Sequence, residues 1–334
     1  MEEVKKRKSY QFINILKAVA IIMVIILHNH TPYTQNNIFF VFCIGMAVPI
    51  FMLITGFNYT NSALIRPFIC VKDYIKTFVH RYVRLTLPFM VILLIEWFFN
   101  IRNIQHHHFT TAYINGGVGP GSYYYPVMLQ IILIFPIIFY VLKKFGEKGL
   151  WSVFAFQLFI EYVQYFLNLN SFMYRQLCFR YLFFVALGSW LVLKKDKIST
   201  NKLLVSLMIG VSYLTIFVSS ESPTAYLPFD KWSRTALLSA FYIFPIFAYI
   251  YYNYGDKRID NRFTALLELI GRASWHIYLI QMLFFAAIRP IGHPLDKTIP
   301  LAICIPLSIL ICVTLGIIFY KSEKFILKVC KIKI

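Results

Sequence analysis

The sequence has little charge, and acidic residues are the scarcest of the charged residues. Only 14% of its 334 residues are charged, whereas soluble domains carry about 25%. It holds 14 Asp and Glu against 33 Lys and Arg, and 59% of the chain is hydrophobic, with a mean hydropathy of +0.66. A soluble protein of this size could not bury so much apolar surface, which excludes a soluble domain, intrinsic disorder and a collagen-like fibre. The composition predicts a polytopic membrane protein.

The sequence also lacks the patterns of disulfide-stapled and metal-binding proteins. Its six cysteines are scattered without CxxC spacing, which excludes a small disulfide-rich secreted module. Three adjacent histidines, 106–108, have no defined set of partner ligands, so we expect no native metal site. In a membrane protein a formal charge of +19 usually marks the cytoplasmic face, and we expect no nucleic-acid partner.

Apolar stretches long enough to cross a bilayer recur along the whole chain. A hydrocarbon core of about 30 Å needs about 20 helical residues per crossing. The alternating pattern of a β-barrel is absent, so backbone groups in lipid must be satisfied within helices. We therefore expect an all-α integral membrane protein with one transmembrane domain over residues 1–334. The ten expected spans are residues 11–30, 38–59, 85–101, 123–142, 150–168, 178–193, 203–220, 236–254, 273–291 and 299–320. Eight or eleven spans are the alternatives, because two amphipathic runs, 66–84 and 259–272, complicate the count.

The positions of Lys and Arg predict the orientation of these spans. With the N-terminus inside, 25 of the 33 basic residues fall in cytoplasmic segments and seven fall outside. Such a bias places both termini in the cytoplasm. The basic segments 1–10 and 321–334 are then a cytoplasmic N-terminus and a cytoplasmic tail.

The first expected span carries a stripe of polar residues. Asn14, Lys17 and His28 share one helix face, and the eleven residues from Lys17 to His28 correspond to about 16 Å of helix. Ionisable residues inside a membrane are candidates for function by default. The alternatives are that Lys17 extends to the cytoplasmic interface and that His28 only ends the helix.

A second motif, Arg81-x-x-Arg84, lies at the inner end of the third span. Three-residue spacing puts both guanidinium groups on one helix face, where they can bind phosphates through forked hydrogen bonds. Positive-inside charge also produces such pairs routinely.

Four further polar residues lie inside apparent spans: Glu96, Glu161, His276 and Gln281. We expect the two glutamates to form ion pairs with Arg102 or Arg175 near the outer face, or to take part in chemistry. Trp275 is interpreted as an anchor at the membrane interface. Residues 116–121 are interpreted as a flexible outer loop that enters a helix, without the spacing of a nucleotide-binding loop.

Four segments, in order along the chain, resemble motifs of the membrane acyltransferase family 3, integral-membrane O-acyltransferases of bacterial surface glycans. The family motifs are approximately D-x-x-R-x-I-A followed by His, P-x-F-F-x-x-S-G-[FY], R-x-x-R-L-x-x-P and S-x-x-I-Y-L-x-H. The matching segments are Asn14-Ile-Leu-Lys17 through His28, Pro49-Ile-Phe-Met-Leu-Ile-Thr55-Gly-Phe57, Arg81-Tyr-Val-Arg84-Leu-Thr-Leu-Pro88 and Ser274-Trp-His-Ile-Tyr-Leu-Ile-Gln281. The sequence departs from the family at Asn14 and Lys17, which stand for Asp and Arg, at Thr55 for Ser and at Gln281 for His.

The resemblance implies a multi-pass enzyme of the cell (plasma) membrane. It would transfer an acyl group, acetyl from acetyl-CoA above all, to a hydroxyl of a cell-surface or lipid-linked polysaccharide. Acetyl-CoA is then a co-substrate on the cytoplasmic side, the glycan acceptor lies at the outer side, and no tightly bound cofactor is expected. A succinyl donor is one alternative. The other is a glycan or lipid-linked sugar exporter that uses His28, Glu96 and Glu161 as a proton path.

The same resemblance assigns roles to the candidate residues. His28 and Lys17 are the catalytic candidates: His28 would act as general base or as a covalent carrier of the acyl group, and Lys17 would stabilise negative charge or hold the donor. Arg81 and Arg84 would bind the donor's phosphates. The candidates for substrate binding are Asn14, Tyr123, Tyr124 and Glu161.

Overall fold

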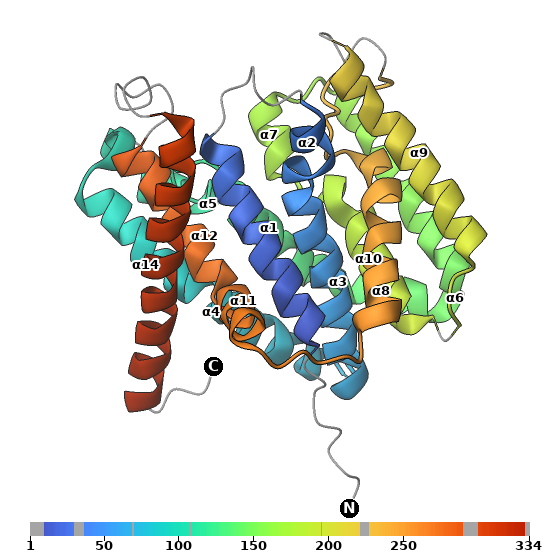
Figure 1. Ribbon diagram of the computed structural model, residues 1–334, viewed down its shortest axis with the longest axis horizontal. Coiled ribbons are helices and arrows are strands. Elements are labelled where there is room, and N and C mark those ends of the chain that lie inside the picture. The colour runs from blue at the N-terminus through green and yellow to red at the C-terminus, as the bar shows by residue number, and fades with distance from the viewer. Residues whose placement is uncertain are drawn as a thin grey trace, which may run out of the picture.

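The computed structural model describes residues 10–29, 37–68, 70–106, 108–194, 196–220, 227–289 and 300–330, and in these ranges it contains helices and turns but no strand (Figure 1). The all-helical prediction is therefore confirmed. The elements in chain order are α1 (Gln11–Asn29), α2 (Ile38–Phe42), η2 (Ile44–Met46), α3 (Ala47–Ile65), α4 (Val71–Phe98), η3 (Ile101–His106), α5 (Phe109–Ile114), α6 (Tyr124–Phe166), α7 (Ser171–Gln176), η4 (Cys178–Tyr181), α8 (Leu182–Leu193), α9 (Thr200–Ser219), η6 (Leu237–Ser239), α10 (Ala240–Tyr254), α11 (Arg262–Arg272), α12 (Ser274–Leu283), the π-helix η7 (Phe284–Ile288) and α14 (Leu301–Val329).

Within the described ranges, six helical stretches are long and apolar enough to cross a membrane. They are α1, residues 38–65, α4, α6, α9 and α14, and shorter apolar helices occupy residues 178–193 and 274–288. The count of ten spans and the cytoplasmic position of both termini stay predictions.

Two boundaries differ from those expected. The amphipathic run that ends at residue 84 is not separate from the expected span 85–101, because α4 continues from Val71 to Phe98 through Pro88. This helix begins where Asp73 accepts a hydrogen bond from the backbone N–H of Cys70 at 3.3 Å, an N-terminal capping interaction. The expected spans 123–142 and 150–168 are the two arms of α6, which bends at Gly146, where φ is 54°.

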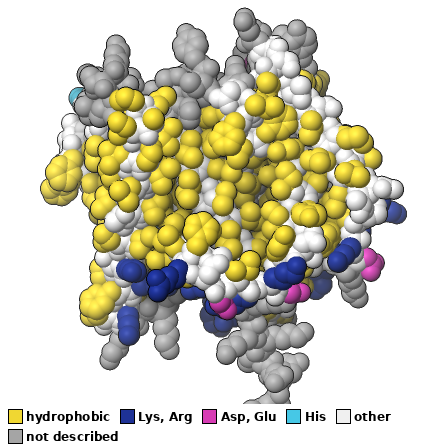
Figure 2. All heavy atoms as spheres, in the orientation of Figure 1, with side chains coloured by type: hydrophobic (Ala, Val, Ile, Leu, Met, Phe, Trp, Pro, Cys, Tyr) yellow, Lys and Arg dark blue, Asp and Glu magenta, His cyan; other side chains and the backbone are white. Residues whose placement is uncertain are grey.

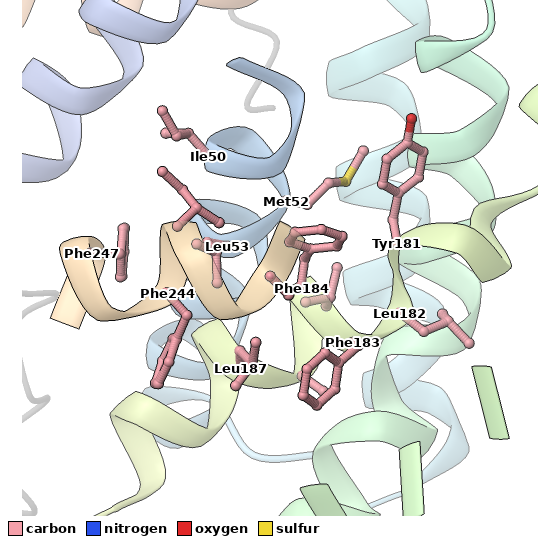
Figure 3. Close-up of a cluster of buried hydrophobic side chains, with 14 of the residues drawn as sticks. Ile50, Met52, Leu53, Tyr181, Leu182, Phe183, Phe184, Leu187, Phe244 and Phe247 are labelled. Carbon is pink, nitrogen blue, oxygen red and sulfur yellow. The ribbon is translucent and has the colours of Figure 1, made fainter. Parts of the chain in front are cut away.

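The largest buried cluster joins α3, α8 and α10 (Figure 3). Met52 and Leu53 on α3 lie beside Phe184 at the start of α8. Two glycines bring the backbones of α3 and α8 together. A Cβ built at Gly56 would lie 2.0 Å from the carbonyl oxygen of Val185 on α8. A Cβ built at Gly188 would lie 2.0 Å from a carbonyl oxygen of α3. Small residues that permit such close approach are typical of helix pairs in membranes.

The molecular surface has a broad apolar belt and a basic rim. On the face that Figure 2 shows, hydrophobic side chains cover most of the area, and Lys and Arg side chains gather at its lower edge. In the same orientation α1 begins and α14 ends at this lower edge (Figure 1). We therefore call this end of the bundle the basic end.

Candidate active site

A cavity of about 180 Å³ lies between α1, α3, the start of α6 and α12. Four of the candidate catalytic and binding residues line it together: Lys17, His28, Tyr123 and Tyr124. The cavity is otherwise lined mainly by apolar side chains, so polar groups in it are few and directed toward a common space.

His28 stands in the last turn of α1, at one side of the cavity. The Phe285 ring lies beside it, with 5.9 Å between the ring centroids. On another side is Gly121, where an added Cβ would be 3.6 Å from His28 Nε2. The imidazole is thus held between an aromatic ring and a stretch of bare backbone, while it still faces the cavity.

The loop that contains Gly121 is packed against helices, which corrects the prediction of a flexible loop; its position at the outer side stays a prediction. Gly116, Gly117 and Gly119 are buried, and the loop is anchored to two helices. Tyr278 on α12 donates a hydrogen bond to the carbonyl of Gly121 at 2.6 Å. Packing against neighbouring helices, which composition does not reveal, fixes this segment.

Glu96 on α4 anchors the same loop and has no part in the expected ion pair. It is fully buried, and its carboxylate accepts a hydrogen bond from the backbone N–H of Val118 at 3.3 Å. Arg102 instead donates to the carbonyl oxygens of Phe285 and Ala286, at 3.2 Å each. A salt bridge between Glu96 and Arg102 is absent from the part of the chain that the structure describes.

Arg81 and Arg84 lie outside the cavity, but Arg81 contacts its wall. The Arg81 guanidinium carbon is 3.8 Å from the ring centroid of Tyr59, which lines the cavity, and 5.5 Å from that of Phe135. Arg84 is exposed on α4, within electrostatic range of the Tyr59 hydroxyl. Arg81 is therefore separated from the cavity by a single aromatic ring.

Asn14 and Glu161, two of the substrate-binding candidates, do not line the cavity. Asn14 is buried on α1, and its carbonyl oxygen would be 1.9 Å from a Cβ built at Gly271, so α11 packs directly on its backbone. Glu161 accepts a hydrogen bond from the Tyr174 hydroxyl at 2.9 Å. Its cationic neighbour is Arg180 and not the expected Arg175.

The other polar candidates also have local partners. His276 lies 2.6 Å from a carboxylate oxygen of Glu323 on α14, an inter-helix pair away from the cavity. Gln281 is buried on α12 beside the glycine-containing loop. Among the residues described, no group of three or more His, Cys, Asp or Glu could hold a metal ion. Of the histidine run 106–108, His107 lies outside the described residues.

Several cavity residues were missed in the sequence. Trp275 is not an interface anchor: it lines the cavity, stacks on Tyr278 at 5.2 Å between centroids, and its indole N–H donates to the carbonyl of Leu85 at 3.3 Å. Trp275 and Tyr278 are three residues apart and so share one helix face, which was the signal available in the sequence. Asn58 and Tyr59 also line the cavity, close after Thr55 on α3. A shared helix face with Thr55 was the corresponding signal for Tyr59.

Comparison with known proteins gives one finding. A family model described as an acyltransferase domain matches residues 10–320, nearly the whole chain. No curated protein and no solved structure shows significant similarity to this chain.

Proposed function

Because the chain belongs to the acyltransferase 3 family, we propose that it transfers an acetyl group from acetyl-CoA to a hydroxyl of a cell-surface or lipid-linked polysaccharide. The family and the apolar helices make it a multi-pass membrane acyltransferase. The observation that carries the finer proposal is the juxtaposition of His28 and Lys17 in one cavity whose wall, Tyr59, is covered by Arg81.

The donor enters from the basic end, which we propose is cytoplasmic. Acetyl-CoA is a polyanion, and Arg81 and Arg84 offer two guanidinium groups for its phosphates. Cytoplasmic faces carry an excess of Lys and Arg, and the rim in Figure 2 is consistent with this assignment. The flexible arm of the donor then passes Tyr59 and carries the thioester into the cavity.

Lys17 and His28 act at different points along this path. About 16 Å of helix separates their α-carbons, so both side chains cannot contact one carbonyl group closely. We assign Lys17 to the arm of the donor, on the side nearer the basic end. His28, at the other end of the stripe, is assigned to the chemistry.

At His28 the acceptor hydroxyl loses its proton to the imidazole while its oxygen attacks the thioester carbonyl. The carbon–sulfur bond breaks, the acetyl group stays on the acceptor oxygen, and coenzyme A leaves as a thiol with the proton returned by the imidazole. A covalent route through an acetylated imidazole gives the same products. Tyr123 and Tyr124 supply aromatic faces on which a sugar ring can stack.

The test compares surface glycans from cells that carry the gene, lack it, or carry His28→Ala at matched protein abundance. Mass spectrometry of the isolated glycan should find a mass increase of one acetyl group only with the intact gene. A mass increase of one succinyl group would instead show that the donor carries succinyl and not acetyl. Glycan of unchanged mass but reduced surface amount in the deletion would refute acyl transfer and favour an exporter.

A further inference from the structure

Three helical elements converge on the C-terminal end of α1 through one buried arginine. Arg289, directly after the π-helix η7, donates hydrogen bonds to Asn29 Oδ1 on α1 and, at 3.2 Å, to Ser308 Oγ on α14. The Ser308 hydroxyl also donates to Asn29 Oδ1 at 3.2 Å. All three side chains are at most 9% exposed. We call these residues, Arg289, Asn29 and Ser308, the clamp.

The clamp acts on the residue next to His28. Asn29 is the last residue of α1, and its side-chain N–H group also donates to the carbonyl of Ile25 at 2.8 Å. The last carbonyls of a helix lack partners within the helix, and helix ends fray unless something else satisfies them. Through Asn29 the clamp closes the final turn of α1, which is the turn that carries His28.

The π-helix places a second contact on the imidazole. Phe285, the ring beside His28, belongs to η7, and Arg289 ends that same element. Arg102 donates to the carbonyls of Phe285 and Ala286 and so fixes this irregular turn from outside. Single π-turns are rare and occur frequently at functional sites. The clamp and the aromatic wall of His28 are therefore one connected unit.

A guanidinium group buried among helices is costly to desolvate unless hydrogen bonds compensate it. A leucine or phenylalanine would fill the same space in an apolar bundle without that cost. We propose that Arg289 is a positioning residue, which sets the orientation of the His28 imidazole through Asn29 and Ser308. The inference rests on the proposed role of His28 in acyl transfer.

The test uses membrane vesicles that contain the full chain at matched abundance, with radiolabelled acetyl-CoA as the donor probe. The variants are Arg289→Met, Arg289→Lys and Ser308→Ala, with Ser239→Ala as control. Ser239 is an equally buried serine whose hydroxyl, among the residues that the structure describes, bonds only to a carbonyl of its own turn. Two quantities are measured: transfer of label to vesicle glycan across donor concentrations, and carbethoxylation of His28 by diethyl pyrocarbonate, read by peptide mass spectrometry.

Arg289→Met should lower the maximal transfer rate about 10- to 100-fold with the KM for acetyl-CoA unchanged, since small misplacements of a reacting group have effects of this size. Arg289→Lys keeps a donor for both partners and should restore most of the rate. Ser308→Ala should fall between, and Ser239→Ala should match the unaltered chain. Carbethoxylation of His28 should become several-fold faster in Arg289→Met, because its turn is released.

The two measurements separate the two hypotheses. If the unaltered chain transfers no label, the proposed function fails. The carbethoxylation rate of His28 then shows by itself whether the clamp positions the imidazole. If His28 reacts at the same rate in Arg289→Met and Ser308→Ala as in the unaltered chain, the positioning role is wrong, whatever the activity. A rise in KM with an unchanged maximal rate would also overturn it. If Arg289→Met does not fold, Ser308→Ala provides both measurements with Arg289 in place.

Discussion

Replacing Tyr59 with leucine tests whether the arginine pair and the cavity form one donor-binding path. Tyr59 is the only residue that the described structure places both in the cavity wall and under the Arg81 guanidinium. Tyr59→Leu keeps an apolar side chain at this position and removes the aromatic face. Arg81 then loses the surface on which it lies and samples other orientations.

The size of the effect follows from the geometry. At 3.8 Å from the ring centroid, Arg81 is well within the range of about 6 Å over which a cation is attracted to a ring. Both side chains are half-buried, which places the interaction at about 1–2 kcal/mol. If donor binding depends on this orientation, the KM for acetyl-CoA should rise about 5- to 30-fold, at 1.36 kcal/mol per factor of ten. The maximal rate should change little, because His28 is untouched.

The assay is transfer of label from radiolabelled acetyl-CoA to vesicle glycan over a range of donor concentrations. Tyr59→Phe keeps the ring and should keep the KM. Tyr140→Leu is the matched control: Tyr140 also lies near a cation, Lys144, at 5.6 Å, but does not line the cavity. An unchanged KM in Tyr59→Leu, or an equal rise in Tyr140→Leu, would refute the connection between Arg81 and the cavity.

Three further predictions concern chemistry and packing. His28→Ala should reduce label transfer by about 10²- to 10⁴-fold at normal abundance, the usual contribution of a general base; near-normal transfer would remove His28 from the mechanism. Lys17→Ala should raise the KM for acetyl-CoA while Lys17→Arg retains most activity, as titration of the donor will show; equal loss in both would contradict a role based on charge. Gly56→Ala should lower the melting temperature in detergent, because its Cβ would lie 2.0 Å from the Val185 carbonyl oxygen and α3 and α8 would have to separate. Gly146→Ala should lower the melting temperature less. No atom lies within 4 Å of the added Cβ, so the only cost is backbone strain at a φ of 54°.

Features set within one helix could be predicted from the sequence. The 3.6-residue period puts Lys17 and His28 on a common face in any α-helix, and in the structure both line the cavity. The helical class also follows from the sequence, because only helices and closed β-barrels satisfy backbone groups in lipid and the alternating pattern of a barrel is absent. The family resemblance, based on four short motifs in order, is confirmed by the match over residues 10–320.

Features set between helices could not be predicted in this way. Trp275 has the same local sequence character whether it meets lipid headgroups or an internal cavity, and only the neighbouring helices distinguish the two. The neighbour of Glu161 is Arg180 and not Arg175, because the turn between α7 and η4 brings the later arginine inward. The burial of the glycine-containing loop depends on Tyr278 and Glu96, which lie far from it in the sequence.

The wall of the cavity beside His28 is main chain, and this limits how the site can diverge. At Gly121 φ is 89°, a conformation that other L-residues rarely adopt, and an added Cβ would point at both His28 and Tyr278. A change of acceptor or acyl group therefore cannot readily be made by substitution at Gly121, beside the imidazole. Altered selectivity in descendants of this chain should arise at side chains across the cavity, such as Thr55, Asn58 and Tyr123. The reacting centre can then stay constant while its surroundings vary.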